Sequence, residues 1–369
     1  MTSPIIALSR RLRRTPFSPR VEAAGVKGFT VYNHMLLPTA FVSVEDDYRH
    51  LKDHVQVWDV SCERQVEIKG PDAARLVQLM TPRDLAKARV GRCFYVPLVD
   101  ETGGMINDPV ALKLAEDRYW LSIADSDVVL WGKGLATGMG LDVSVEEPDV
   151  SPLGVQGPKA DDLMARVFGD AVREIRFFGF ALLDFRGHPL IVARSGWSKQ
   201  GGFEIYLDDF SLGLDLWDAL MEAGKPLNVR AGCPNLIERI EGGLLSYGND
   251  MTYENNPFEC GLDRFCNLDA PTEFLGRDAL QAVHDKGPDR LIKGIRIDGE
   301  PVPACVDIWS VAVDGASVGI VTSAAWSPDL STNVAFAMLE RGHWDVGHEV
   351  AVETPTGTRS GTVADIPFI

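Results

Sequence analysis

The residues best equipped for chemistry lie in one short stretch, Arg194 to Tyr206. Alternation along its second half predicts a strand with Glu204 and Tyr206 on one face and Phe203 on the other. A carboxylate accepts two parallel hydrogen bonds from an amino-pyrimidine edge, as it does from arginine. Aromatic rings, here Tyr206 and the nearby Trp197, stack on flat heterocycles or face a cation. The stretch therefore indicates a binding site, and an ordinary loop and edge strand is the alternative that composition alone allows.

Three glycines, Gly196, Gly201 and Gly202, precede this strand. Because glycine lacks a Cβ, it adopts positive φ angles and lets the backbone approach a ligand closely. We expect a bend here that leads into the strand carrying Glu204.

The composition bounds the class of protein. Of 369 residues, 45% are hydrophobic and 24% are charged, which is typical of a globular chain. A formal net charge of −17 argues against nucleic acid or an anionic membrane as partner. Six cysteines without a CxxC pair indicate reduced thiols. No apolar run approaches the roughly 18 residues of a membrane span, and no apolar segment follows the basic residues near the start. We expect a cytoplasmic protein without a membrane partner or a secretory signal.

The chain repeats one local pattern. Residues 65–80 and 155–167 each read as a strand, a Gly-Pro pair and an amphipathic helix, which suggests two related α+β halves. After the linker candidate Asp285–Asp289, short alternating strands separated by Gly and Asp predict a small all-β domain. We predict an α+β region over residues 1–285, made of two interleaved domains, and a β-barrel-like domain over residues 286–369.

Several catalytic signatures are missing from the sequence. It contains no GxxxxGK[ST] loop, no GxGxxG after a strand, no CxxC zinc pattern and no GxSxG elbow. Phosphoryl transfer, hydride transfer with a nucleotide cofactor and serine hydrolysis lose their support. We assign no metal-binding residues.

Four separated stretches resemble the glycine-cleavage T-protein (aminomethyltransferase) family in order. They are residues 103–108 (its "GGxxDD" turn), 194–205 ("RTGYTGEDGFEI"), 239–250 ("RLEAGLxLYGND") and 319–328 ("GxVTSGxxSP"). The resemblance implies a three-domain α+β fold around a central folate channel, with tetrahydrofolate as cofactor and Glu204 holding its pterin.

Departures from the glycine-cleavage enzymes point to one branch of this family. Asn107 replaces the first aspartate of the turn, and residues 197–201 read Trp-Ser-Lys-Gln-Gly in place of "YTGED". Residues 26–41, VKGFTVYNHMLLPTAF, resemble the dimethylsulfoniopropionate demethylase branch. This resemblance implies a methyltransferase that moves a methyl group from dimethylsulfoniopropionate to N5 of tetrahydrofolate, giving 3-(methylthio)propionate and 5-methyltetrahydrofolate.

That reaction agrees with the missing motifs. A sulfonium methyl is already activated because its leaving group departs as a neutral thioether, so no metal, strong acid or covalent nucleophile is needed. Holding the two reactants in line supplies roughly 7–11 kcal/mol. Positive charge spreads in the transition state, so a partly dry pocket lined by aromatic rings favours it.

The resemblance and this chemistry together assign roles to ten residues. Asp108 is the catalytic candidate; it orients the folate ring and favours the cation formed on it. The candidates for cofactor binding are Glu204, Tyr206, Tyr95, Ser122 and Arg239, with Arg239 contacting folate or ordering Asp108. The candidates for substrate binding are Trp197, Tyr32 and Phe178 as an aromatic cage for the sulfonium, and Lys199 or another cation for its carboxylate.

Alternatives remain open at this point. A second enzyme hypothesis keeps folate but has another donor: a methylated amine, a methoxy-arene or an aminomethyl-lipoyl protein. The last of these is the donor in glycine cleavage, which Trp197 and Asn107 disfavour. A third hypothesis is a folate-binding protein without catalysis. The sequence determines neither the donor, nor whether Asp108 acts chemically, nor the oligomeric state, for which a homodimer is one arrangement that it allows.

Overall fold

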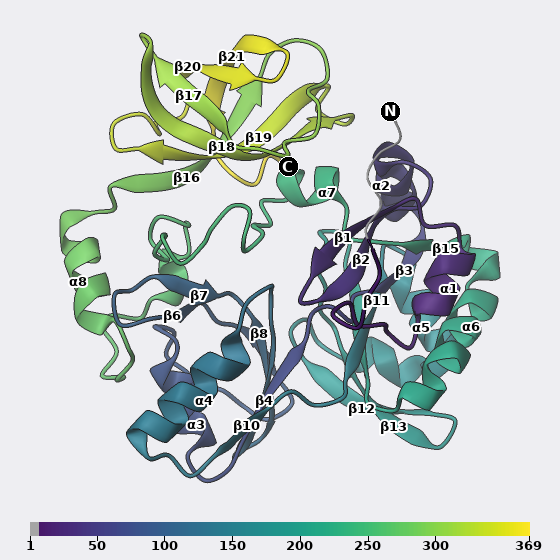
Figure 1. Ribbon diagram of the computed structural model, residues 1–369. Helices are drawn as coiled ribbons and strands as arrows, with labels where there is room; N and C mark the ends of the chain where they lie inside the picture. The colour runs from purple at the N-terminus through teal and green to yellow at the C-terminus, as the bar shows by residue number, and fades with distance from the viewer. Residues whose placement is uncertain (1–6) are drawn as a thin grey trace. The chain divides into compact units, whose positions relative to one another are not determined.

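A computed structural model describes residues 7–369, and the chain divides into two compact units (Figure 1). The first unit contains the described residues up to Arg64 together with Pro148–Gly196 and Gln200–Pro234. The second contains Gln65–Glu147, Trp197–Lys199 and Asn235–Ile369. The bend predicted at residues 194–202 therefore contributes to both units.

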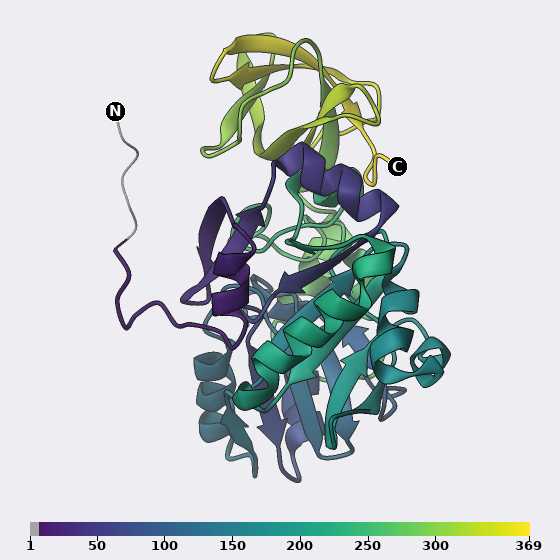
Figure 2. The ribbon, with the colours of Figure 1, turned by 90° about the vertical axis from the view of Figure 1, so that its right-hand side faces the viewer.

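A six-stranded sheet forms the centre of the first unit. Its strands, in spatial order, are β12 (Phe180–Phe185), β13 (His188–Ala193), β14 (Gly202–Leu207), β11 (Ser151–Gln156), β3 (Val55–Asp59) and β15 (Val229–Gly232). Only the β3–β15 pair is parallel. The helices α5 (Ala160–Phe168) and α6 (Gly213–Ala223) pack on one face of this sheet (Figure 2). Phe203 and Ile205 are fully buried in the core on that face.

The opposite face of this sheet carries Glu204. Strand register aligns Ala193, Glu204, Gly154 and Trp58 in one row across four strands. Directly paired residues share a face of the sheet, so this row points away from the core that holds Phe203. The predicted alternation along β14 is confirmed.

Smaller elements complete the first unit. They are α1 (Ser18–Ala23), the antiparallel pair β1 (Gly28–Tyr32) and β2 (Met35–Ala40), α2 (Val44–Asp53), and the 3-10 turns η1 (Asp170–Glu174), η2 (Phe210–Leu212) and η3 (Lys225–Leu227). The side chain of Ser43 caps α2 by accepting a hydrogen bond from the amide of Asp46. Leu51 of α2 packs on Trp58 and Val60, so this helix covers part of the face that carries Glu204.

A five-stranded antiparallel sheet belongs to the second unit. Its order is β10 (Ser144–Glu146), β4 (Gln65–Lys69), β9 (Arg118–Ser122), β8 (Val110–Ala115) and β5 (Cys93–Tyr95). Two helices, α3 (Ala73–Leu79) and α4 (Val128–Met139), bury their apolar sides on one face. The short pair β6 (Leu98–Val99) and β7 (Met105–Asn107) leads to Asp108.

The repeated strand, Gly-Pro and helix pattern is present in both sheets. Strand β4 leads through Gly70 into α3, and β11 leads through Gly157 into α5. The two glycines have φ angles of +139° and +124°, and a Cβ on either would lie about 2.5 Å or less from a backbone carbonyl oxygen. Glycine at these positions lets a helix start directly against its neighbouring chain.

The C-terminal residues form the predicted all-β domain. Strands β16 (Arg290–Ile297), β17 (Trp309–Val313), β18 (Ala316–Ser327), β19 (Thr332–Glu340), β20 (Glu349–Thr354) and β21 (Gly357–Ala364) close into a barrel in the order β16-β19-β18-β17-β20-β21 (Figure 1). Closure leaves no free sheet edge. Before it come α7 (Leu236–Glu241), the turn η4 (Asp263–Phe265) and α8 (Arg277–Lys286). Among residues 7–369, no helix has the length and apolar character needed to cross a bilayer.

The glycine geometry makes the bend before β14 a sensitive point. Gly202 has φ +152°, and a Cβ there would lie 2.2 Å from the carbonyl oxygen of Val155. We expect Gly202→Ala to destabilise the protein by at least about 1–3 kcal/mol, the usual cost of backbone strain alone, measured by chemical denaturation. Gly201→Asn is the matched control, because Gly201 has φ +76° and open space around it. Equal stability of the two variants would contradict this account of the bend.

Candidate functional site

Glu204 is a buried carboxylate held by hydroxyl groups. Its side chain is 6% exposed, accepts a hydrogen bond from the hydroxyl of Ser195, and accepts another from Tyr206 Oη at 3.3 Å. Burial raises the pKa of Glu204, and the two hydroxyl donors lower it only in part. Because a carboxylate offers about four acceptor positions, Glu204 has room for further N–H donors.

Gln156 holds the bend that positions Ser195. Its Nε2 donates to the carbonyl oxygens of Ser195 at 3.1 Å and Phe203 at 3.2 Å. A Cβ on Gly196, which has φ +138°, would lie 2.0 Å from that same nitrogen. The predicted role of Gly196 in the bend is thus explained by the space that Gln156 takes.

The two residues of the first unit that were predicted for the sulfonium cage, Phe178 and Tyr32, lie on separate segments. Phe178 is half-buried, adopts φ +55° and donates its amide to the carbonyl oxygen of Arg194 at 3.0 Å. A positive φ is a genuine outlier for a bulky residue, and such strain concentrates at functional positions. Tyr32 is also half-buried but ends β1, in a different sheet from Glu204.

Asp108 and Tyr95 form the polar centre of the second unit. Tyr95 Oη donates to Asp108 Oδ2 at 2.9 Å. Burial raises the pKa of Asp108 to about 7, with a further rise from the negative charge of Asp250, while the Tyr95 hydroxyl opposes it. Burial and the Asp108 charge raise the pKa of Tyr95 well above 10, so this phenol stays protonated and donates.

Ser122 lies on the same sheet face as Tyr95. Register aligns Gln65, Ser122, Val110 and Tyr95 in one row across β4, β9, β8 and β5. Their neighbours Val66, Leu121 and Ala111 are in the core with α3 and α4, so the row faces away from these helices. Gln65 Nε2 donates to Ser122 Oγ at 2.9 Å. The structure thus brings together three of the predicted residues, Tyr95, Ser122 and Asp108.

Asn107 is a structural clamp beside Asp108. Its Nδ2 donates to the carbonyl oxygen of Ala124 at 3.1 Å and to Ser126 Oγ at 2.8 Å, and its Oδ1 accepts from the amides of Asp108 and Ala124, both at 3.0 Å. A carboxylate at this position could not donate to the Ala124 carbonyl. The amide therefore secures the loop that precedes Asp108.

Arg239 is part of a buried ion-pair network. Its Nη1 lies 2.8 Å from Asp250 Oδ2, and its Nη2 donates to Ser323 Oγ at 2.6 Å. Ser323 and Thr322 of β18 donate in turn to Asp250 Oδ1 at 2.6 and 2.7 Å. The acidic partner of Arg239 is thus Asp250, which was not among the predicted site residues. The match of residues 239–250 to one family signature was the signal that could have linked the two.

Trp197 and Lys199 lie beside this network. The guanidinium of Arg239 is 5.8 Å from the centroid of the Trp197 ring. The amide of Lys199 donates to Glu238 Oε1 at 2.5 Å, and the Lys199 side chain is exposed. Within the part of the chain that the structure describes, no carboxylate lies within salt-bridge distance of the Lys199 ammonium. This ammonium is therefore available to an anionic group.

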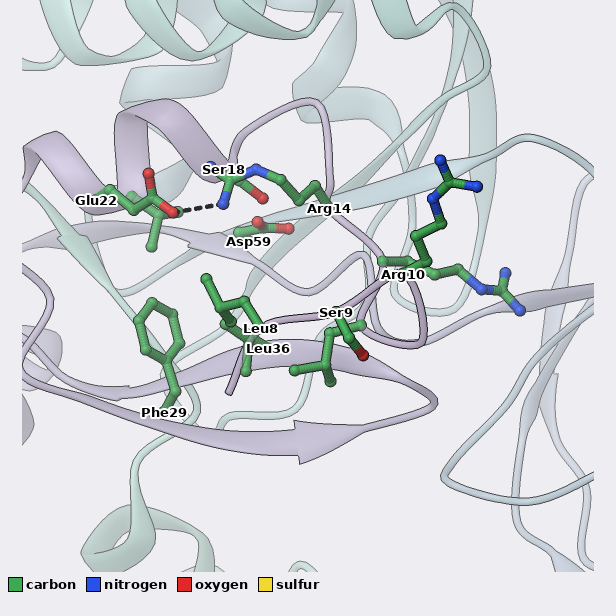
Figure 3. A pocket seen from close by; sticks show the side chains of 12 residues that line it. Leu8, Ser9, Arg10, Arg14, Ser18, Glu22, Phe29, Leu36 and Asp59 are labelled. Carbon is green, nitrogen blue, oxygen red and sulfur yellow. Dashed lines mark ion pairs between the residues drawn. The ribbon is translucent and has the colours of Figure 1, made fainter. Parts of the chain in front are cut away.

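A cavity of about 310 Å³ lies elsewhere in the first unit, under the segment of Leu8 to Arg14 (Figure 3). The ion pair of Arg14 with Glu22 lines one side at 2.7 Å, and Phe29 lines another. Its wall includes Asp59, whose pKa burial raises, although hydroxyls of Ser61 and Thr15 oppose the rise. The predicted site residues are not among those that line this cavity.

The raised pKa of Asp108 predicts a pH-dependent stability. Below about pH 4 the carboxyl is protonated in both states, and between about 4 and 7 the unfolded state loses its proton first. The unfolding free energy contributed by Asp108 therefore falls as pH rises through this window, by about 1.4 kcal/mol for each pH unit. We expect Asp108→Asn to remove this slope, measured by denaturant unfolding from pH 4 to 8.

Two companion variants sharpen that measurement. Tyr95→Phe removes the hydroxyl that favours the ionised form, so the falling part of the curve should extend to higher pH by about 1–2 pH units. Asp117→Asn, at an exposed turn, serves as the control and should leave the wild-type slope. A wild-type slope in Asp108→Asn would show that another group carries the titration.

Comparison with known proteins places this arrangement in a family. A family model described as the GCVT N-terminal domain matches residues 17–270, and one described as the glycine cleavage T-protein C-terminal barrel domain matches residues 290–369. A Ruegeria pomeroyi protein named dimethylsulfoniopropionate demethylase is 60% identical over 97% of both chains. A Symbiobacterium thermophilum aminomethyltransferase is 30% identical over 98% of both.

The fold has a solved counterpart. The glycine cleavage system aminomethyltransferase T from Bartonella henselae superposes with a TM-score of 0.85 at 24% identity, covering 97% of this chain and 98% of that chain. The predicted α+β fold of the T-protein type, with its small all-β C-terminal domain, is confirmed. The chain belongs to the glycine-cleavage T-protein (aminomethyltransferase) family.

Proposed function

We propose that this protein is a tetrahydrofolate-dependent demethylase that transfers a methyl group from dimethylsulfoniopropionate to N5 of tetrahydrofolate, giving 3-(methylthio)propionate and 5-methyltetrahydrofolate. The observation that carries the proposal is the 60% identity, over 97% of both chains, to a protein named for that demethylation. One short segment also carries the free ammonium of Lys199 and the ring of Trp197. These two groups suit the carboxylate and the sulfonium of this small-molecule donor.

The surroundings of Glu204 fit a reduced pterin. The buried carboxylate has acceptor capacity left for the N–H edge of a flat heterocycle. Gly154 stands directly beside it in the strand register, and the three atoms nearest to a Cβ there would belong to Trp58 and Val60, at 3.4 Å or more. The row thus offers an acceptor next to a position without a side chain, and Tyr206 adds a ring at the same strand. When bound, tetrahydrofolate supplies the nucleophilic nitrogen that accepts the methyl group.

Asp108 supplies a tunable negative charge. With a pKa of about 7, its carboxyl is divided between neutral and ionised forms at neutral pH. The ionised form favours a neighbouring cation, and the hydroxyl of Tyr95 keeps that form oriented. We propose that this charge orients the folate ring and stabilises positive charge as it spreads from the donor.

Trp197 is the proposed contact for the sulfonium. An aromatic face attracts a cation of low hydration, and the attraction is largest when water is excluded. Arg239 would repel such a donor if its own charge were free, but Asp250 neutralises it at 2.8 Å. We propose that Phe178 and Tyr32 complete the cage and that Lys199 binds the donor carboxylate.

The remaining expectations stay predictions. They are the homodimer, the cytoplasmic location, the lack of nucleic-acid or membrane partners, and the division of the chain at residue 285. The charge of −17 supports the prediction about nucleic acid.

A donor panel tests the proposed reaction. The purified protein is incubated with tetrahydrofolate and, separately, dimethylsulfoniopropionate, a methylated amine, a methoxy-arene and an aminomethyl-lipoyl protein. Mass spectrometry measures 5-methyltetrahydrofolate for the methyl donors and 5,10-methylenetetrahydrofolate for the aminomethyl-lipoyl protein. We expect product with the sulfonium donor alone, since its leaving group is a neutral thioether that departs more readily than an amine and needs no proton. Product from another donor alone would reassign the substrate, and folate binding without any turnover would favour a binding protein.

Removal of the carboxylate tests the folate site. Pterin N–H donors favour ionised Glu204, so binding releases a proton and folate affinity should rise with pH through the raised pKa of the free carboxyl. We expect Glu204→Gln to weaken binding by about 1.5–3 kcal/mol and to remove this pH dependence, measured by calorimetric titration. Glu174→Gln, at an exposed position, is the control. Unchanged affinity in Glu204→Gln would place the pterin elsewhere.

A further inference from the structure

Gly242 and Lys199 are in direct contact in the second unit. A Cβ on Gly242 would lie 2.6 Å from Cγ and 3.2 Å from Cε of Lys199. Both carbons belong to the aliphatic part of the lysine, so its side chain lies along the bare backbone of Gly242. Gly242 has φ −79° and ψ −3°, which any L-residue adopts. The same Cβ would lie 3.1 Å from the carbonyl oxygen of Glu238, so Cγ of Lys199 is its tightest contact. The space that the lysine takes, and not the backbone dihedral angles, therefore favours glycine at this position.

Glu238 and Gly242 hold the lysine from one helix face. They are four residues apart on α7 and its C-cap, so they lie one above the other. Glu238 accepts a hydrogen bond from the backbone amide of Lys199 at 2.5 Å, while Gly242 leaves space for the Lys199 side chain. One contact fixes where the lysine backbone sits, and the other fixes the direction of its side chain.

A side chain at position 242 would compete with the lysine for the same space. Alanine at 242 beside lysine at 199 would force the lysine out of its observed rotamer, because the Cγ atom lies close to the chain and cannot swing away alone.

We infer that Gly242 is a positioning residue, which seats the Lys199 side chain on α7 so that its ammonium selects methyl donors that carry a carboxylate. The inference rests on the proposed demethylase function. Since no carboxylate among the described residues pairs with this ammonium, its charge is available for a substrate anion. Selectivity of this kind would separate a zwitterionic sulfonium from a purely cationic one of the same size.

Steady-state kinetics with two donors test the inference. Dimethylsulfoniopropionate is compared with dimethylpropylsulfonium, which lacks the carboxylate, in wild type, Gly242→Ala, Lys199→Met and the double variant. We expect Gly242→Ala to raise KM for dimethylsulfoniopropionate about three- to tenfold, with no change for dimethylpropylsulfonium or tetrahydrofolate. In the Lys199→Met background Gly242→Ala should have no further effect. Gly138→Ala, in α4 with nothing within 4 Å of the added Cβ, is the matched control.

The outcomes separate the inference from the proposed function. Three results with an active wild type would overturn the role of Gly242 and leave the demethylase function standing. Gly242→Ala could keep the wild-type KM for dimethylsulfoniopropionate, or it could raise KM equally for both sulfonium donors. It could also raise KM further in the Lys199→Met background. If wild type turns over neither sulfonium, the proposed function fails and the inference fails with it. Thermal melting of each variant confirms that the Gly242→Ala effect is not a loss of folding.

Discussion

The structure depends on two carboxylates, the buried Glu204 and the half-buried Asp108, that are held by hydroxyl groups and, within residues 7–369, not by cations. Glu204 is held by Ser195 and Tyr206, and Asp108 by Tyr95. A carboxylate buried without a cation is costly, and its pKa rises until the neutral form competes. Because no cation among the described residues is paired with these carboxylates, their oxygen atoms keep free lone pairs and a negative potential. A ligand with N–H donors or a developing positive charge would be attracted to them. Burial of this kind lowers stability, and the binding proposed for these two carboxylates would offset that cost.

Arg239 and Asp250 show the contrasting solution. This pair is buried, but each charge has its opposite at 2.8 Å, and two hydroxyls from β18 donate to the other oxygen of Asp250, Oδ1. A pair of this kind contributes little attraction to a ligand and much to order, because removing either partner strands a buried charge. The two arrangements suit different roles: the hydroxyl-held carboxylates suit the ligand binding proposed for them, whereas the ion pair lies 5.8 Å from the Trp197 ring and orders its own surroundings.

Local sequence patterns predicted much of the fold. Alternation placed Glu204 opposite Phe203, the Gly-Pro pairs marked where α3 and α5 begin, and the short alternating runs after residue 289 became the barrel. These features depend on neighbours within a few residues, for which periodicity and glycine chemistry are sufficient. The family signatures added the site candidates, whose roles remain proposals.

Long-range side-chain pairing lay beyond those patterns. Arg239 meets Ser323, 84 residues further along the chain, and no local period encodes such a contact. The clamp of Asn107 on Ala124 and Ser126 and the raised pKa of Asp108 likewise arise only once distant segments are packed. A residue type can be read from a sequence, whereas its electrostatic surroundings require the fold.

Ser323 and Thr322 donate hydrogen bonds to Asp250 across the boundary between two stretches of the chain. These bonds limit where the protein could be divided into fragments. The two stretches matched by separate family models look like exchangeable modules, with a loop before Arg290 as the natural cut. A fragment ending at that loop would keep Asp250 and Glu241 but lose their hydroxyl partners Thr322, Ser323 and Ser327 on β18. In such a fragment Asp250 would keep its ion pair with Arg239, but its Oδ1 atom and the carboxylate of Glu241 would lose these hydroxyl donors. The barrel therefore supplies hydroxyl donors to acidic residues that precede it. A barrel exchanged for another in evolution would have to bring the same hydroxyl groups.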